Sequence, residues 1–294
     1  MTETSWLPSH ELEELRGKLT RVRPQVIELL VAIMERLRVE SPHTWDELEM
    51  PDARLRRDSY LLRFVLPLAE LSGWPTQVDL KLPDALASHL LWCLTWRRID
   101  DLVDEPSQPR VNTDQVAEVA VMVARAAALH QRVASRYQFC DLEGVEDLLR
   151  LTCQVAAGER SAPVAQDHIW QRASPFLIAP RYLLELTSEK ERVYCSYLNL
   201  VGLLHDAHDV ARDLEAGLCT LPIQWLTEID GKRVFRPEVL QQWFTRIATE
   251  LKHAIDEVRS GCVGQDWPVL NVLIAEADEY RSETEAGGLT VYEG

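Results

Sequence analysis

The sequence predicts an all-α protein that folds as a single-domain helical bundle. Its 294 residues contain only 12 glycines and 15 prolines, which leaves long stretches free of residues that break helices. In those stretches apolar residues recur every three or four positions, as on one face of a helix, and do not alternate as in a strand. We find no internal repeat and no linker long enough to separate domains. Residues 1–294 are therefore predicted to form one domain, with a flexible tail from about residue 287.

The predicted helices, in chain order, cover residues 9–38, 51–72, 83–105, 112–138, 142–158, 167–188, 189–216, 236–260 and 267–286. Several of them carry signals that favour a helix start. Ser9 precedes an acidic first turn, Pro83 and Asp84 open the third helix, and Asn112 and Ser188 begin two later ones. The links between the helices contain most of the remaining prolines and glycines.

The charge balance argues against nucleic acids and membrane surfaces as partners. The chain has 31 Lys and Arg against 47 Asp and Glu, a formal net charge of −16, which repels phosphate backbones and anionic lipids. No run approaches the roughly 20 apolar residues that span a bilayer, and the N-terminus MTETSWLPSH does not resemble a signal peptide. The six cysteines form no CxxC pair, so we expect reduced thiols. We expect a cytoplasmic protein without membrane insertion, and the sequence leaves a homodimer open.

The predicted helix 83–105 ends in a cluster of acids, Asp100, Asp101, Asp104 and Glu105. The C-terminal end of a helix prefers cations, so this placement costs stability unless a counter-ion is present. Asp100 and Asp104 are one helical turn apart and can reach the same divalent cation, with Asp101 beside them. The alternative is a solvated acidic cap that pairs with the two arginines preceding it.

The predicted helix 189–216 carries a second cluster. His205, Asp209 and Asp213 are spaced by four residues and form one line along the helix. Like charges at this spacing repel unless a cation lies between them. Two carboxylates and one imidazole suit Mg²⁺, or Mn²⁺, and the absence of cysteine from the cluster argues against Zn²⁺. The other interpretation is an exposed acidic face on a mostly buried helix.

The two clusters resemble the motifs of the class I isoprenoid synthase superfamily. Residues 100–104, DDLVD, match its DDxxD motif in full. Residues 205–213 have the spacing of the second motif of terpene cyclases, NDxxSxxxE, but carry His for Asn, Asp for Ser and Asp for Glu. The continuation through Gly217 to Leu221 and Pro222 is also similar to the Asn-x3-Asp-x3-Asp-x3-Gly-x3-Leu-Pro pattern of squalene and phytoene synthases.

The resemblance implies an enzyme that ionises a prenyl diphosphate at the mouth of a central apolar cavity. Each acidic cluster would hold part of a magnesium cluster that neutralises the leaving diphosphate. Arg160 stands close to where terpene cyclases carry a diphosphate-sensing arginine, and Arg212 matches the basic residue before the last acid. Arg281 follows Tyr280, the reverse of the late Arg-Tyr pair of the family. These three arginines are the implied donors to diphosphate oxygens.

The same resemblance implies that apolar stretches upstream of the acids line the cavity. The aromatic residues that could face a carbocation are Phe64, Trp96, Phe176, Tyr197 and Trp225. Simple packing in a helical core is the alternative for each of them. His89, about three turns before Asp100, is either a proton acceptor in the cavity or a hydrogen-bonded core histidine. No general base is assigned.

Three chemistries share this machinery: cyclisation of one diphosphate, head-to-head joining of two, and chain elongation. Chain elongation is disfavoured because no arginine pair follows closely after DDLVD. The long N-terminal region before DDLVD favours a cyclase, whereas the Gly217 continuation favours a head-to-head synthase. A helical binding protein with solvated acids is the alternative outside the enzyme class.

Overall fold

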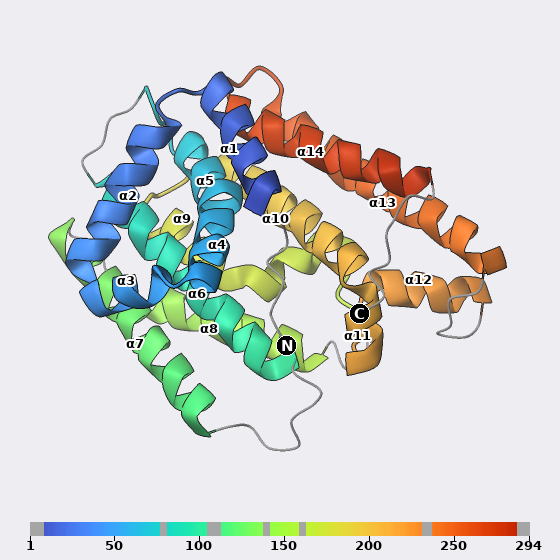
Figure 1. Ribbon diagram of the computed structural model, residues 1–294, viewed down its shortest axis with the longest axis horizontal. Helices are drawn as coiled ribbons and strands as arrows, with labels where there is room; N and C mark the ends of the chain where they lie inside the picture. Colours follow the sequence, from blue (N-terminus) through green and yellow to red (C-terminus); the bar gives the residue numbers. More distant parts are fainter. Residues whose placement is uncertain are drawn as a thin grey trace. The chain divides into compact units, whose positions relative to one another are not determined.

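The structure is a computed structural model that describes residues 9–76, 81–104, 113–137, 142–158, 163–230 and 237–286. Every regular element in these ranges is helical, which confirms the predicted all-α class (Figure 1). The elements, in chain order, are α1 (Ser9–Val22), α2 (Val26–Glu40), α3 (Pro42–Leu48), α4 (Pro51–Tyr60), the π-helical turn η1 (Leu61–Val65), α5 (Leu66–Leu71), α6 (Leu82–Asp104), α7 (Thr113–Arg136), α8 (Leu142–Gly158), the 3₁₀ helix η2 (Gln166–Leu177), α9 (Ile178–Tyr182), α10 (Ser188–His208), α11 (Val210–Ala216), α12 (Leu221–Asp230), α13 (Pro237–Cys262) and α14 (Pro268–Glu285). None of the helices in the described ranges is long and apolar enough to cross a membrane.

The contacts between residues divide the chain into two units, each assembled from separate segments. The first unit takes its residues from 1–146, 175–191 and 267–272. The second takes its residues from 147–174, 192–266 and 273–294. The two acidic clusters belong to different units, and the single domain stays a prediction.

Helix α6 is central to the first unit, where it contacts α2, α4, α7 and α9. Its buried leucines are Leu82, Leu86, Leu90, Leu91 and Leu94. Buried Asp84, in its first turn, accepts hydrogen bonds from Arg136 at 2.6 Å and from the Tyr137 hydroxyl at 2.9 Å. Arg36 of α2 pairs with the same carboxylate at 3.1 Å. One buried charge therefore ties α2 and the end of α7 to the start of α6.

In the second unit, α12 packs against α11 and α13. The indole nitrogen of Trp243 donates to the carbonyl of Pro222 at 2.7 Å, and Trp243 is fully buried. The guanidinium of Arg246 lies over the ring of the buried Trp225, 5.7 Å from the ring centroid. These contacts anchor the segment that follows the second acidic cluster.

Prolines explain where two of the predicted helices break. Pro24 has no N–H donor, and the predicted helix 9–38 divides there into α1 and α2. In the predicted helix 51–72, Pro67 cannot bond to the carbonyl four residues earlier. The chain widens just before it into η1, in which the Leu66 N–H bonds to the Leu61 carbonyl.

The first half of the predicted helix 167–188 is the 3₁₀ helix η2, and the short α9 follows it. Pro175 lies inside η2 and Pro180 inside α9, so two donors of a regular α-helix are missing. Ala173 has φ −106° and ψ 28°, outside the helical region. The segment therefore relies on side-chain contacts to keep its shape.

Two helices lie in stretches that the sequence predicts as links. Helix α3 starts at Pro42, and α12 has Pro222 in its first turn. Proline is favourable at the first positions of a helix because its missing N–H is not needed there. The proline that suggests a break in the sequence therefore marks a helix start in the structure.

Candidate functional site

The first acidic cluster lies in the last turn of α6. The backbone of Asp100, Asp101 and Asp104 is helical, but their side chains lie outside the described part of the structure. Arg98, which could pair with these acids, donates to Glu118 of α7 at 2.8 Å. The role of the three aspartates in binding metal stays a prediction.

The second cluster lies where the predicted helix 189–216 is interrupted. Asp209 has φ −94° and ψ 9°, in the sparsely populated bridge region, and separates α10 from α11. The backbone hydrogen bonds nevertheless continue, from the Asp209 N–H to the His205 carbonyl and from the Asp213 N–H to the Asp209 carbonyl, both at 2.9 Å. The structure thus keeps the predicted one-turn spacing of His205, Asp209 and Asp213.

Cationic and polar groups converge on the Asp209 carboxylate. His205 Nε2 lies 3.3 Å from Oδ2, and Arg212 Nη2 donates to the same oxygen at 2.5 Å. His208 Nδ1 lies 2.9 Å from Oδ1. The sequence assigns no role to His208, yet its side chain is in direct contact with the central residue of the motif.

The Asp209 carboxylate stays ionised in this environment. Burial alone would raise its pKa, but the hydrogen bond from His208 and the charges of His205 and Arg212 outweigh burial and hold the pKa well below its usual range. Asp213 is 5% exposed, deeper than Asp209. The motif therefore presents one ionised, partly exposed carboxylate and one buried carboxylate.

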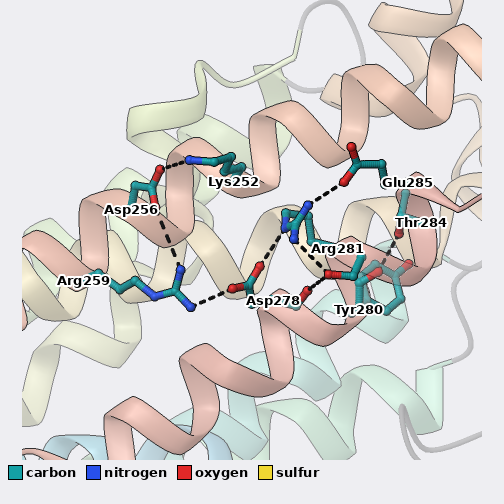
Figure 2. Close-up of polar contacts among 9 residues, drawn as sticks. Lys252, Asp256, Arg259, Asp278, Tyr280, Arg281, Thr284 and Glu285 are labelled. Atoms are coloured by element: carbon teal, nitrogen blue, oxygen red, sulfur yellow. Dashed lines mark hydrogen bonds and ion pairs between the residues drawn. The ribbon is translucent and has the colours of Figure 1, made fainter.

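Tyr280 and Arg281 of α14 lie in different surroundings. The Tyr280 hydroxyl is buried and has no hydrogen-bond partner among the described residues. Burial and the negative charge of Asp209 raise the pKa of this phenol. Arg281 instead donates to Asp278 and Glu285, each at 2.7 Å, in the ion-pair cluster between α13 and α14 (Figure 2). Arg281 as a diphosphate donor stays a prediction, in which these ion pairs would have to open.

Three of the predicted cavity residues come together in the first unit. The rings of Phe64 and Phe176 meet edge to face with centroids 4.9 Å apart, and His89 meets Phe176 at 6.0 Å in the same manner. Tyr60, which the sequence does not single out, joins the cluster at 5.0 Å from Phe64. Such edge-to-face contacts stabilise a core and fix the orientation of the rings.

His89 has the contacts of a core histidine. It is fully buried, and burial lowers its pKa to about 3, although its hydrogen bond to the Phe64 backbone acts in the opposite direction. That bond reaches a carbonyl of η1, where the π-helical turn disturbs the regular pattern. Cys93 Sγ lies 3.5 Å from His89 Nε2. His89 is therefore neutral at physiological pH.

The remaining candidates are spread over both units. Tyr197 of α10 is buried and stacks on Tyr194, with ring centroids 6.4 Å apart. Trp96 of α6 is half-buried. Arg160 lies outside the described residues. A surface pocket of about 360 Å³ in the first unit is lined by Gln25, Glu28, Leu29, Trp74, Pro75, Thr76, Leu82 and Pro83 and includes no predicted site residue.

Comparison with models of protein families, with curated proteins and with solved structures finds no match for this chain. The resemblance of the two acidic clusters to class I isoprenoid synthases therefore stays a prediction. The same holds for the magnesium ions and the prenyl diphosphate substrate.

The second cluster fits Mg²⁺ in the chemistry of its donor atoms. In the described part of the chain, no group of three or more His, Cys, Asp or Glu side chains is arranged to hold a metal ion. His205 and Asp209 are in contact, however. The Tyr280 hydroxyl, buried and without a hydrogen-bond partner among the described residues, is close enough to Asp209 for the charge of that carboxylate to raise the pKa of the phenol. A divalent ion would have to replace the Arg212 guanidinium at Asp209 Oδ2.

Proposed function

We propose that the chain is a magnesium-dependent class I terpene synthase, which ionises a prenyl diphosphate and cyclises or rearranges the carbocation. The observation that carries the proposal is the state of the Asp209 carboxylate. It is ionised and 16% exposed, and it pairs with His205 one helical turn away and with Arg212, whose side chain is 49% exposed. A carboxylate in this state can exchange one cation for another without the cost of ionising a buried acid.

The residues of the second cluster would divide the work between metal and diphosphate. Bound magnesium would neutralise the charge that develops on the leaving group. His205, Asp209 and Asp213 would hold it. Arg212, released from Asp209, would donate to diphosphate oxygens, for which a guanidinium provides two parallel N–H groups.

The aromatic residues of the first unit suit the apolar part of the reaction. Phe64 and Phe176 pack edge to face and carry no nucleophilic atom, so a carbocation in contact with them would not be trapped. His89 is neutral with a pKa of about 3, so it adds no positive charge beside a cation. The wall of the predicted cavity is the role that the resemblance assigns to these residues.

The second candidate function is a helical binding protein that performs no catalysis. The contacts of Asp209 with His205, His208 and Arg212 favour it, because they balance the carboxylate without a metal ion. The head-to-head synthase receives no comparable support. Gly217 ends α11 with φ 73°, and Pro222 lies in the first turn of α12, so both residues of that continuation have structural roles.

Thermal unfolding with Mg²⁺, with pyrophosphate and with both together tests the proposal. We expect stabilisation by the pair, about 2.7 kcal/mol at 100 times the dissociation constant. Turnover is then measured with geranyl, farnesyl and geranylgeranyl diphosphates, each alone and with isopentenyl diphosphate. If neither stabilisation nor turnover is observed, the result favours the helical binding protein. A product with twice the number of carbons of the substrate would indicate a head-to-head synthase.

A further inference from the structure

The 3₁₀ helix η2 is held against one face of α10. The side-chain amide of Asn199 accepts a hydrogen bond from the Trp170 N–H at 2.7 Å and donates to the Asp167 carbonyl at 3.1 Å. One turn further along α10, Gly202 allows close approach, since a Cβ there would lie 2.4 Å from Ile169 Cγ2. Two positions of α10 therefore fix the first half of η2.

A third contact fixes the second half of η2. Arg172 donates from Nη1 to Asp206 Oδ1 at 2.9 Å and from Nη2 to Asp206 Oδ2 at 2.7 Å. Asn199, Gly202 and Asp206 are separated by three and four residues, so they lie on one side of α10. The segment η2 consists of two short 3₁₀ stretches that meet at the kink at Ala173. The contacts with α10 hold the residues up to this kink in place.

Asp206 directly follows His205 and precedes Asp209 by three residues. It is 2% exposed, and both of its carboxylate oxygens bind Arg172. This pairing compensates its charge, so it adds little repulsion to the neighbouring cluster. Asp206 and Arg172 are therefore suited to hold the end of α10 in place, whereas the more exposed Asp209 is suited to bind a ligand.

We propose that Arg172 is a positioning residue for the second acidic cluster. By fixing Asp206, it sets the rotation of the last turn of α10 just before the interruption at Asp209. Each residue of a helix turns by about 100°, so a small rotation of this turn moves His205 away from Asp209. The ligand in this inference rests on the proposed function, but the positioning of residues 205–213 does not.

The test compares Arg172→Gln, Arg172→Lys and wild type by the Mg²⁺ dependence of thermal unfolding at fixed pyrophosphate. Arg181→Gln is the matched control, because Arg181 is also partly buried and donates twice to a carboxylate, that of Glu191. We expect Arg172→Gln to weaken the apparent Mg²⁺ affinity at least about tenfold, as removal of outer-shell partners does. Arg172→Lys keeps the charge but loses the fork, and about threefold weakening is expected. The control should stay within about twofold of wild type.

An apparent affinity of Arg172→Gln within about twofold of wild type would overturn the inference. If that variant does not fold, the double variant Arg172→Gln, Asp206→Asn leaves no uncompensated buried charge and takes its place with the same expected loss. If wild type is not stabilised by Mg²⁺ with pyrophosphate, the proposed function fails. Backbone amide shifts of Arg172→Lys then decide the positioning role: changes through residues 209–213 support it, and changes confined to the neighbours of positions 172 and 206 contradict it.

Discussion

The surroundings of His89 and of Asp209 show two ways in which this protein accommodates a polar group. His89 is fully buried, has a pKa of about 3 and hydrogen-bonds to the Phe64 backbone, so the site is neutral and complete. Asp209 is ionised and partly exposed, and its partners are themselves charged or able to become so. A ligand would gain little at the first site, whereas at the second it can replace an existing partner. Under the proposed function, ligand exchange is therefore expected at the junction of α10 and α11, whereas the contacts of His89 are those of a packed core.

The largest expected effect comes from removing the negative charge of Asp209. Asp209→Asn should lower turnover of the prenyl diphosphate by more than about 100-fold, since a direct ligand contributes more than the outer-shell groups whose loss costs 10 to 100-fold. The same variant should lose the stabilisation by Mg²⁺ with pyrophosphate. Lys252→Gln, which removes an exposed ion pair with Asp256 on α13, serves as the control. Full turnover by Asp209→Asn would remove Asp209 from the metal site.

Because His89 is neutral in the folded protein, we expect the stability of the protein to depend on pH. His89 resists protonation in the folded state down to about pH 3, but in the unfolded chain it takes up a proton below its ordinary pKa of 6.5. The unfolded state then binds more protons than the folded state. The contribution of His89 to the free energy of unfolding should therefore fall by about 1.4 kcal/mol for each pH unit below pH 6.

His89→Gln keeps a donor for the Phe64 carbonyl but does not titrate. Urea unfolding of wild type and of this variant between pH 7 and 4.5 measures the difference in their free energies of unfolding. That difference should shrink as the pH falls, because only wild type loses stability when position 89 is protonated in the unfolded chain. The contributions of the acidic residues are the same in both proteins and cancel. A constant difference would show that His89 is accessible to protons in the folded state.

The sequence is enough to predict most of the helices and the spacing of the second cluster. It is not enough to predict the contacts between helices that hold this cluster in place. The three- and four-residue apolar spacing is enough for the all-α class, and the helical period places His205, Asp209 and Asp213 on one line. Proline is favourable at a helix start and unfavourable in a helix interior, which explains why α12 is missed and why the predicted helix 167–188 is replaced by η2 and α9. Arg172 could not be found from spacing, because its partner lies 34 residues away on another helix. The one available signal is that a buried aspartate requires a cation.

A smaller effect is expected at Arg212, where the guanidinium now occupies Asp209 Oδ2. Arg212→Gln should lower stability by less than about 1 kcal/mol, since the arginine is half exposed. Mg²⁺ alone should stabilise the variant more than wild type, because the carboxylate has lost a competing cation. Mg²⁺ with pyrophosphate should stabilise it less, because the diphosphate has lost a donor. Equal responses of the two proteins to both additions would show that Arg212 neither competes with the metal nor contacts the diphosphate.

Two glycine substitutions, for which we expect no change in the response to Mg²⁺ with pyrophosphate, distinguish a structural glycine from a functional one. Gly217 ends α11 with φ 73°, and the Leu218 N–H bonds to the Asp213 carbonyl at 2.9 Å. Gly217→Ala forces a side chain into the left-handed region and should cost about 1 kcal/mol of unfolding free energy. Gly17, inside α1, has open space around an added Cβ, so Gly17→Ala should instead stabilise by about 0.5 to 1 kcal/mol. Denaturant unfolding measures these opposite signs, and we expect both variants to keep the wild-type response to Mg²⁺ with pyrophosphate. Loss of that response in Gly217→Ala alone would give the glycine a role in the site and favour the squalene and phytoene synthase branch, because a helix end that only stops α11 has no reason to affect the ligand.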